Sequence, residues 1–134
     1  MTQAVQPKKS PPARLRRRSE FLRAAASGLS RSSRAFKLQM AAREDASDEP
    51  RFGVTVTKRV AKAVGRNRIR RRLKEALRLS GALAAAQGYD YVLVARREAL
   101  TAPFSALEAQ MAQTFRRLSS DRTKPLPHQA SKKP

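Results

Sequence analysis

The sequence predicts an α+β domain in which helices pack on a small, mostly antiparallel sheet. Residues 36–43 and 52–57 alternate apolar with polar side chains, which is the period of a strand with one buried face. Residues 91–95 are continuously apolar, which is typical of a more central strand covered on both faces. Segments near 62–81 and 103–118 carry apolar residues at helical spacing. With a short helix before the first strand, the predicted order is α-β-β(-β)-α-β-α.

The first predicted helix lies in "RRRSEFLRAAASG", where Ser19 is the expected N-cap and Gly28 the expected terminator. The strand that follows places Phe36 on its inward side. A polar, acidic turn region then leads into the second strand. We expect these two strands to be antiparallel neighbours.

The second helix is expected to start between Lys62 and Asn67 and to end near Gly81. About a third of its circumference is apolar and should face the core. This stripe consists of Ile69, Leu73, Ala76 and Leu77. The side opposite the stripe is basic and carries Arg71, Lys74 and Arg78. Arg70 and Arg72 lie on the flanks.

The last helix is expected to begin near Pro103, because proline fits the first turn of a helix. Its apolar stripe consists of Phe104, Leu107, Met111, Phe115 and Leu118. Residues 1–14 and 119–134 are rich in Pro, Ser, Lys and Arg and have little to bury, so they are expected to be disordered basic tails. One folded domain is therefore placed at residues 15–118.

The charge of the chain points to a polyanionic partner. Its 134 residues include 30 Lys and Arg against 10 Asp and Glu, a formal net charge of +20. Nucleic acid is the leading candidate, because phosphates present closely spaced negative charge; an anionic membrane surface and acidic proteins are the others. The chain has no cysteine, which fits a reducing compartment, and no apolar run long enough to cross a membrane. We therefore expect a cytoplasmic protein.

The segment "VGRNRIRRRLKEALRLSG" concentrates this charge. Between Lys58 and Arg78 the sequence contains many basic residues and a single acidic residue, Glu75. A helix built only for solubility would pair Glu with Lys to relieve the repulsion. Phosphates can supply the missing countercharge, and arginine matches their oxygens with a planar, bidentate fork. The stretch is therefore predicted to contact nucleic acid.

Several other residues admit both a functional and a structural interpretation. Gly65 would let the chain enter the helix at an unusual φ. Asn67 could cap a turn, or hydrogen-bond a 2′-hydroxyl or a base edge. Phe21, Arg34 and Phe36 could form a stacking surface for unpaired bases, or the aromatic side chains could simply pack in the core.

Protein-borne catalysis is not expected. The single histidine, His128, lies in the predicted C-terminal tail, so no histidine-based acid–base pair or triad is available. The acidic cluster at residues 44–49 fits a solvated turn better than a metal site. The sequence has no glycine-rich phosphate loop and no zinc-ligand spacing. No catalytic or metal-binding residues are therefore assigned.

Residues 52–78, "FGVTVTKRVAKAVGRNRIRRRLKEALR", resemble the protein subunit of bacterial ribonuclease P in their strand, Lys-rich turn, Arg-Asn-Arg motif and basic helix. Looser similarity covers "RRRSEFLRA", "SSRAFKLQM", "YDYVLVARREA" and the last helix. The resemblance implies a ribosomal protein S5 domain 2-like fold with a left-handed βαβ crossover, contrary to the usual right-handed rule. It implies a catalytic RNA subunit that positions Mg²⁺ ions and removes the 5′ leader of precursor tRNA. The expected partners are that RNA and precursor tRNA, with no membrane and no obligate protein partner.

The resemblance also assigns two groups of binding residues. The group expected to contact the RNA subunit is Lys58, Arg59, Lys62, Arg66, Asn67, Arg68, Arg70, Arg71 and Lys74. The group expected in a cleft for the single-stranded leader, between the first helix and the sheet, is Phe21, Arg34, Phe36, Thr55 and Lys58. Two aromatics often found in that family are replaced here by Ala25 and Gln39, which implies weaker or rearranged stacking.

Three alternatives rank behind this hypothesis. A general structural RNA-binding protein, such as a small ribosomal protein, would share the charge and the basic tails, but the context of the Arg-Asn-Arg motif argues against it. A nuclease acting alone is disfavoured by the missing histidine and acidic constellation. A membrane-surface protein would need a helix with an exposed apolar face, and the sequence predicts none.

Overall fold

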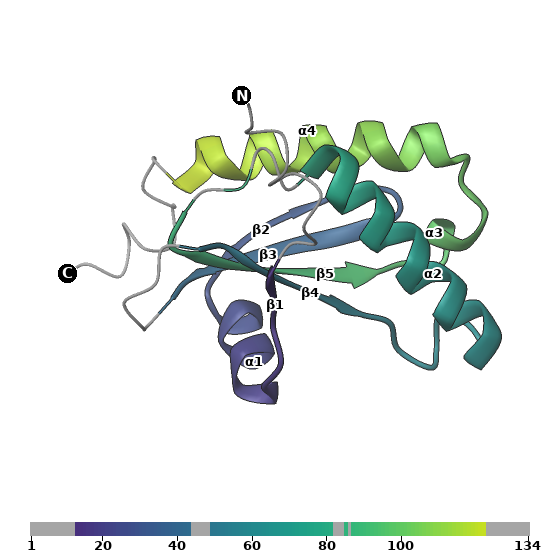
Figure 1. Cartoon of the computed structure of the whole chain (residues 1–134), viewed down its shortest axis with the longest axis horizontal. Helices are drawn as coiled ribbons and strands as arrows, with labels where there is room; N and C mark the ends of the chain where they lie inside the picture. Colours follow the sequence, from purple (N-terminus) through teal and green to yellow (C-terminus); the bar gives the residue numbers. More distant parts are fainter. Residues whose placement is uncertain (1–12, 44–48, 82–84, 86, 123–134) are drawn as a thin grey trace, which may run out of the picture.

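The computed structural model describes residues 13–43, 49–81, 85 and 87–122. Within these residues, helices and one sheet form the predicted α+β architecture (Figure 1). The elements in chain order are β1 (Ala13–Arg14), α1 (Arg18–Ala26), β2 (Leu29–Ser32), β3 (Phe36–Ala42), β4 (Arg51–Thr55), α2 (Ala63–Ala76), the π-helical turn η2 (Leu77–Gly81), β5 (Tyr89–Ala95), α3 (Glu98–Thr101) and α4 (Phe104–Arg122).

The folded part extends slightly beyond the predicted span of 15–118, because β1 precedes it and α4 continues past it. Residues 1–12 and 123–134, most of the two predicted tails, lie outside the described residues, as do residues 44–48 of the acidic loop. β1 and α3 are too short to carry a periodic pattern, which is why periodicity did not predict them.

The five strands form one mixed sheet in the order β1-β4-β5-β3-β2. β5 lies at its centre, antiparallel to β3 and parallel to β4, which confirms the prediction made from its apolar run. The expectation that β3 and β4 are neighbours is wrong, because β5 lies between them. A continuously apolar strand is favoured at the centre of a sheet, where both of its faces are covered. The alternating patterns of β3 and β4 show that each has a buried face, but they do not show whether another strand lies between the two.

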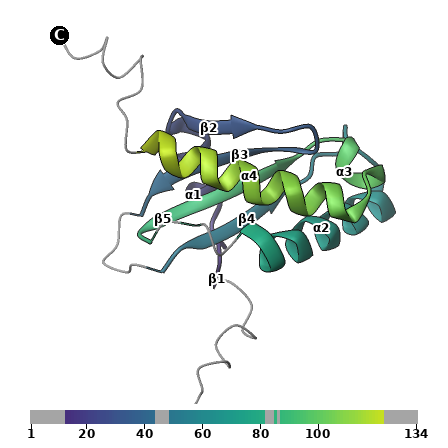
Figure 2. The same cartoon turned by 90° about the horizontal axis from the view of Figure 1, so that it is seen from above.

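The connection from β4 through α2 to β5 is a βαβ crossover between parallel neighbours. Figure 2 views it from the side of α2 and α4. Both strands run from left to right there, and β5 lies on the far side of β4 from α2. This arrangement is a left-handed crossover, as the resemblance implied and against the general right-handed preference.

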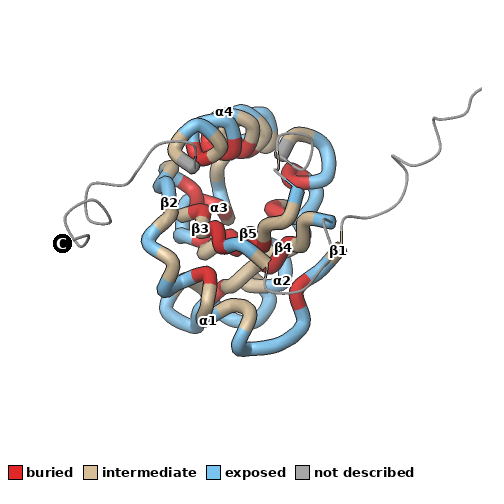
Figure 3. The backbone as a smooth tube through the Cα atoms, turned by 90° about the vertical axis from the view of Figure 1, so that its left-hand side faces the viewer, coloured by how far each residue is buried: buried red, intermediate tan, exposed pale blue. Residues whose placement is uncertain are grey.

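The main core lies between the sheet and helices α2 and α4 (Figures 1 and 3). Its large buried side chains are Phe36, Leu38, Met40, Phe52, Ile69, Leu73, Leu77, Tyr91, Leu93, Leu107, Met111, Phe115 and Leu118. The apolar stripes predicted for the second and last helices are therefore confirmed, except that Phe104 is only partly buried. At the centre, the rings of Phe52 and Tyr91 stack with centroids 5.6 Å apart, and Tyr91 meets Phe115 at 5.0 Å.

Among the described residues, α1 and the segment before it cover the opposite face of the sheet, and the core there is small. Four buried residues form it, namely Leu15, Ala24, Ala41 and Val92. Phe21 and Val94 pack against them and are partly exposed. Burial of Ala41 shows that β3 is covered at one end on its second face, where the sequence pattern predicted a single buried face.

A buried ionic cluster joins α1 to this face. Asp90, at the start of β5, is fully buried and accepts hydrogen bonds from Arg51 Nε and Nη2 at 2.8 Å each. Arg23 Nη2 on α1 donates to the same carboxylate at 2.9 Å. Arg51 Nη1 also reaches Glu20 at 2.9 Å. Because a buried charge without partners is costly, these contacts fix α1 relative to β4 and β5.

Glu20 caps the start of α1. The N-cap is Arg17, so the prediction of Ser19 is wrong: the helix starts one residue before Ser19. The Glu20 carboxylate accepts the backbone N–H groups of Arg17 and Arg16 at 3.0 Å each, which satisfies groups that the helix leaves free. These hydrogen bonds, the one from Arg17 foremost, lower the pKa of Glu20. Gly28, just past the helix, has a φ of 84°, which suits its predicted role as terminator.

Replacing Asp90 with Asn should lower the free energy of unfolding by about 3–5 kcal/mol, because Arg23 and Arg51 would lose the charge they neutralise. Urea denaturation measures this loss. The matched control is Asp121→Asn, since Asp121 pairs with Arg31 at 2.7 Å on the surface and its removal should cost about 0–1 kcal/mol. Equal losses in the two variants would contradict an anchoring role for Asp90.

The effect of Glu20 on stability should depend on pH. Its folded pKa lies below the ordinary value of 4.5, so ionised Glu20 stabilises the fold above that pH, and the contribution is lost as pH falls through the folded pKa. Glu20→Gln should therefore destabilise the protein at about pH 7 and have a smaller effect at about pH 3. Urea denaturation at the two pH values tests this, and a difference that stays constant would argue against it.

Candidate nucleic-acid interface

A cleft of about 590 Å³ lies between α1 and the sheet and is named here the α1 cleft. Its lining residues are Arg16, Arg18, Phe21, Leu22, Ala25, Gln39, Val54, Thr55, Val56, Arg70, Val92 and Val94. Most of these side chains are apolar, and the charged ones are all arginines. The cleft that the resemblance placed between the first helix and the sheet is thus present.

Phe21 lies close to the backbone of β4 because residue 53 is glycine. A Cβ atom at Gly53 would lie 2.5 Å from Phe21 Cε2 and 2.6 Å from Cζ, too close for any side chain. The ring is therefore held against the sheet while part of it stays exposed in the cleft. A glycine inside an alternating strand, as at Gly53, is a sequence signal for such a close approach.

Phe36 was predicted to lie in the leader cleft, and this prediction is wrong. Its side chain is fully buried in the core under α4, so the structural alternative is the right one. The reason is the alternation along β3: Phe36 shares its face with Leu38 and Met40, whereas α1 covers the other face.

The other predicted cleft residues divide into two groups. Thr55 lines the α1 cleft beside Phe21, and so do Ala25 and Gln39, the two replaced aromatic positions. Arg34 and Lys58 are exposed in turns and do not line the cleft. The structure therefore brings together only part of the predicted set.

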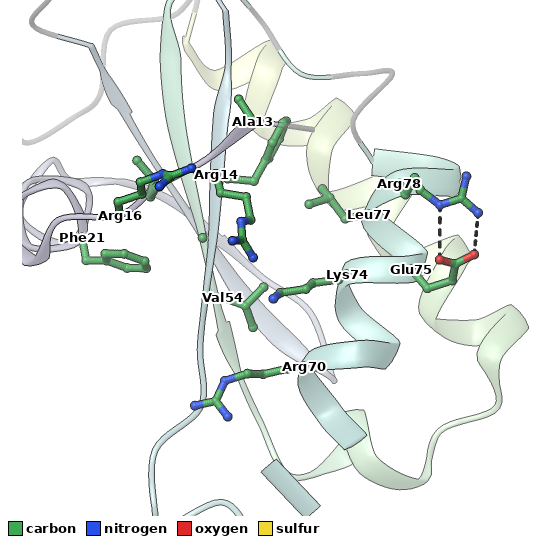
Figure 4. Close-up of a pocket in the computed structure, with 13 residues that line it drawn as sticks. Ala13, Arg14, Arg16, Phe21, Val54, Arg70, Lys74, Glu75, Leu77 and Arg78 are labelled. Atoms are coloured by element: carbon green, nitrogen blue, oxygen red, sulfur yellow. Dashed lines mark hydrogen bonds and ion pairs between the residues drawn. The ribbon is translucent and has the colours of Figure 1, made fainter. Parts of the chain in front are cut away.

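A second groove of about 630 Å³ lies at the outer edge of β4 and is named here the β4 edge groove (Figure 4). Its lining residues are Ala13, Arg14, Leu15, Arg16, Phe21, Phe52, Gly53, Val54, Arg70, Lys74, Glu75, Leu77 and Arg78. It exists because β1 pairs with β4 only at Arg51 and Phe52, after which the chain turns away into α1. Sequence patterns did not predict this groove.

The cations of α2 occupy two surfaces. Arg70 and Lys74 line the β4 edge groove, and Arg70 also lines the α1 cleft. Arg68 and Arg71 are exposed and line neither. The predicted RNA-subunit group is therefore split between a groove surface and an outer surface of the same helix, while Lys58, Arg59 and Lys62 are exposed just before it.

The Arg-Asn-Arg motif lies inside α2. Arg66 turns back and donates to the carbonyl of Ala61 at 2.9 Å, so it braces the helix start, whereas Arg68 is free of the core. Asn67 is not a cap, because the N-cap is Lys62; its Oδ1 accepts a long hydrogen bond from Arg70. Gly65 is helical, so the prediction of an unusual φ is wrong, and glycine is instead needed because a Cβ would lie 2.9 Å from that of Ala61.

Two further arginines, Arg72 of α2 and Arg78 of η2, are held by contacts within the protein. Arg72 is half-buried and donates to the carbonyls of Ala99 and Ala102 at the end of α3. Burial, followed by the charge of Arg68, lowers its pKa. Arg78 pairs with Glu75 at 2.6 Å, and this hydrogen bond lowers the pKa of the Glu75 carboxyl. Glu75, the single acidic residue of α2, is therefore paired with Arg78.

No three His, Cys, Asp or Glu side chains come together as a metal site within the described ranges. This part of the chain thus offers no clustered donor set for the Mg²⁺ ions that the resemblance implies. Over the same residues, no helix combines the length and the apolar character that crossing a bilayer requires.

These surfaces define a class of protein: a small α+β fold with a cationic helix beside an apolar cleft rimmed by arginine, features that suit unpaired nucleic acid. The family model for Ribonuclease P matches residues 10–119. A Brucella suis ribonuclease P protein component is 44% identical over 106 residues, covering 74% of each chain. One from Gluconacetobacter diazotrophicus is 42% identical and covers 78% of this chain and 89% of its own. The chain belongs to the ribonuclease P protein family.

Solved structures show the same fold. The RNase P protein from Thermotoga maritima superposes with a TM-score of 0.66 at 24% identity, covering 78% of this chain and 96% of its own. The Staphylococcus aureus RNase P protein gives 0.65 at 22% identity and covers 78% and 93%. The arrangement of helices on the five-stranded sheet is therefore that of solved members of the family.

The different burial of Phe36 and Phe21 can be tested by measuring how much each alanine substitution destabilises the protein. Phe36→Ala should cost about 3–5 kcal/mol of unfolding free energy, because it empties a fully buried site. Phe21→Ala should cost clearly less, since its ring is partly exposed in the α1 cleft. Urea denaturation of the two variants gives the comparison. Equal losses would mean that Phe21 is a core residue as well.

Proposed function

We propose that this chain is the protein subunit of a ribonuclease P whose catalytic subunit is RNA, and that it assists removal of the 5′ leader from precursor tRNA. The observation that carries the proposal is the placement of the α1 cleft beside the cationic α2 in a member of this family. A general structural RNA-binding role would explain the charge but not the cleft.

The outer surface of α2 is assigned to the RNA subunit. Arg68 and Arg71 are exposed there, and Lys58, Arg59 and Lys62 extend the surface from the preceding turn. A strongly basic body between two RNAs lowers their mutual repulsion, and so lowers the Mg²⁺ concentration that assembly needs. We assign the Mg²⁺ ions to the RNA, and the cysteine-free composition suits work in the reducing cytoplasm.

The α1 cleft is assigned to the single-stranded leader. Phe21 offers a partly exposed ring for base stacking, and Arg16, Arg18 and Arg70 can meet phosphates at the rim. Leader contacts are remote from the bond that is cleaved, so they favour precursor over mature tRNA, which lacks the leader. With Ala25 and Gln39 in place of aromatics, stacking depends mainly on Phe21.

The test is single-turnover cleavage of a precursor tRNA by a bacterial ribonuclease P RNA at low Mg²⁺, with and without the protein. We expect the protein to restore cleavage at the 5′ boundary of the mature tRNA. Arg68→Ala should weaken binding to the RNA subunit and reduce the log–log salt slope by roughly 0.7–0.9, the value for one lost phosphate contact. Arg117→Ala, an exposed cation on α4, is the matched control and should leave the slope unchanged.

Two results would count against the proposal. If the protein bound many RNAs tightly without restoring cleavage, the structural RNA-binding alternative would be favoured. If Arg68→Ala and Arg117→Ala had the same salt slope as the parent protein, the outer surface of α2 would not be the contact with the RNA subunit.

A further inference from the structure

The β4 edge groove gathers more positive than negative charge among the described residues that line it. Arg14 from β1 and Lys74 from α2 point into the same space from opposite walls, and Arg70 reaches it from the next turn of α2 (Figure 4). Among the described residues that line the groove, the one carboxylate is Glu75, which is bound to Arg78 at 2.6 Å. Like charges held together raise the free energy of the empty groove, and an anion in it would lower that energy.

The floor of the same groove is apolar. Leu15, Phe52, Val54 and Leu77 line it, together with Ala13. A small inorganic anion would gain nothing from such a floor, and a duplex keeps its bases stacked inside. A single strand presents both phosphates for the cationic rim and base faces for the apolar floor. Charge and apolar lining together therefore fit single-stranded RNA.

The groove adjoins the α1 cleft. Phe21, Val54, Arg16 and Arg70 line both, so the Phe21 ring lies at the boundary that the two share. A strand that leaves the α1 cleft past Phe21 would enter the β4 edge groove without leaving the cationic surface. The open edge of β4 makes this passage possible, because β1 pairs with only two of its residues.

We propose that the β4 edge groove binds the upstream part of the leader, the nucleotides farther from the cleavage site than those in the α1 cleft. This inference rests on the proposed function of the α1 cleft. The chain's own residues 1–12 are disfavoured as the occupant, because they include Lys8 and Lys9 and no Asp or Glu. The groove would make affinity depend on leader length.

The test uses the full chain assembled with a bacterial ribonuclease P RNA and two precursor tRNAs, with leaders of roughly 4 and roughly 12 nucleotides. Arg14→Ala should weaken binding of the long-leader precursor by roughly threefold to tenfold and reduce its salt slope by about 0.7, with no change for the short leader. Arg14→Lys keeps the charge and should restore affinity. Arg117→Ala, which lines neither groove nor cleft, is the matched control.

Phe21→Ala separates failure of this inference from failure of the proposed function. If it weakens both precursors more than mature tRNA while Arg14→Ala has no length-dependent effect, the α1 cleft holds the leader and the β4 edge groove does not. If Phe21→Ala weakens precursor and mature tRNA equally, the proposed function of the cleft is wrong. Equal losses from Arg14→Ala at both leader lengths would assign the groove to the RNA subunit or to the tRNA body, and would overturn the inference. Binding of an acidic peptide in the groove, together with no effect of leader length on affinity, would also overturn the inference.

Discussion

One fully buried carboxylate, Asp90, makes an open cleft beside α1 compatible with a stable fold. α1 has little apolar surface with which to pack on the sheet, and only Ala24 on it is buried. The helix is instead held through Arg23 and Arg51, which meet Asp90 where β4 and β5 begin. Because this anchor is ionic and local, α1 does not need to bury its whole length, and the remaining sheet surface beside it stays available as the α1 cleft.

The two faces of the sheet differ in how much apolar surface they bury. α2 and α4 bury nearly all the large apolar side chains on one face, including the aromatic group of Phe52, Tyr91 and Phe115. Since hydrophobic burial scales with apolar area, that face supplies most of the free energy of folding. The α1 face can then leave Phe21, Val54 and Val94 partly exposed, although side chains of this kind are usually buried in a small domain. Strand alternation points Phe36 of β3 into the main core, whereas Phe21 lies on α1 and packs on the other face of the sheet.

Local sequence patterns predicted the features that depend on residues close together in the chain. Helical spacing located α2 and its core stripe, and a continuous apolar run identified the central strand β5. Partners far apart in the chain left no periodic signal: Asp90 meets Arg51 across 39 residues and Arg23 across 67. For the same reason the sheet order and the β4 edge groove could not be predicted, because both depend on which distant strands pair. Gly53 carried a readable signal, a glycine within a strand, but its meaning depended on knowing that Phe21 lies above it.

The geometry of α2 explains how one short helix could serve both RNAs of the proposed function. Its core stripe occupies about a third of the circumference, which leaves room for two cationic surfaces on one rigid element. Arg70 and Lys74 lie on the groove surface and Arg68 and Arg71 on the outer surface, while Glu75 pairs with Arg78 at the far end. The cations on one surface repel those on the other, because about one helix diameter separates them. An RNA bound at one surface would neutralise cations there and so lower this repulsion. Because the two surfaces lie on one helix, binding of the RNA subunit and of the leader should be coupled electrostatically, and the coupling should weaken as salt rises.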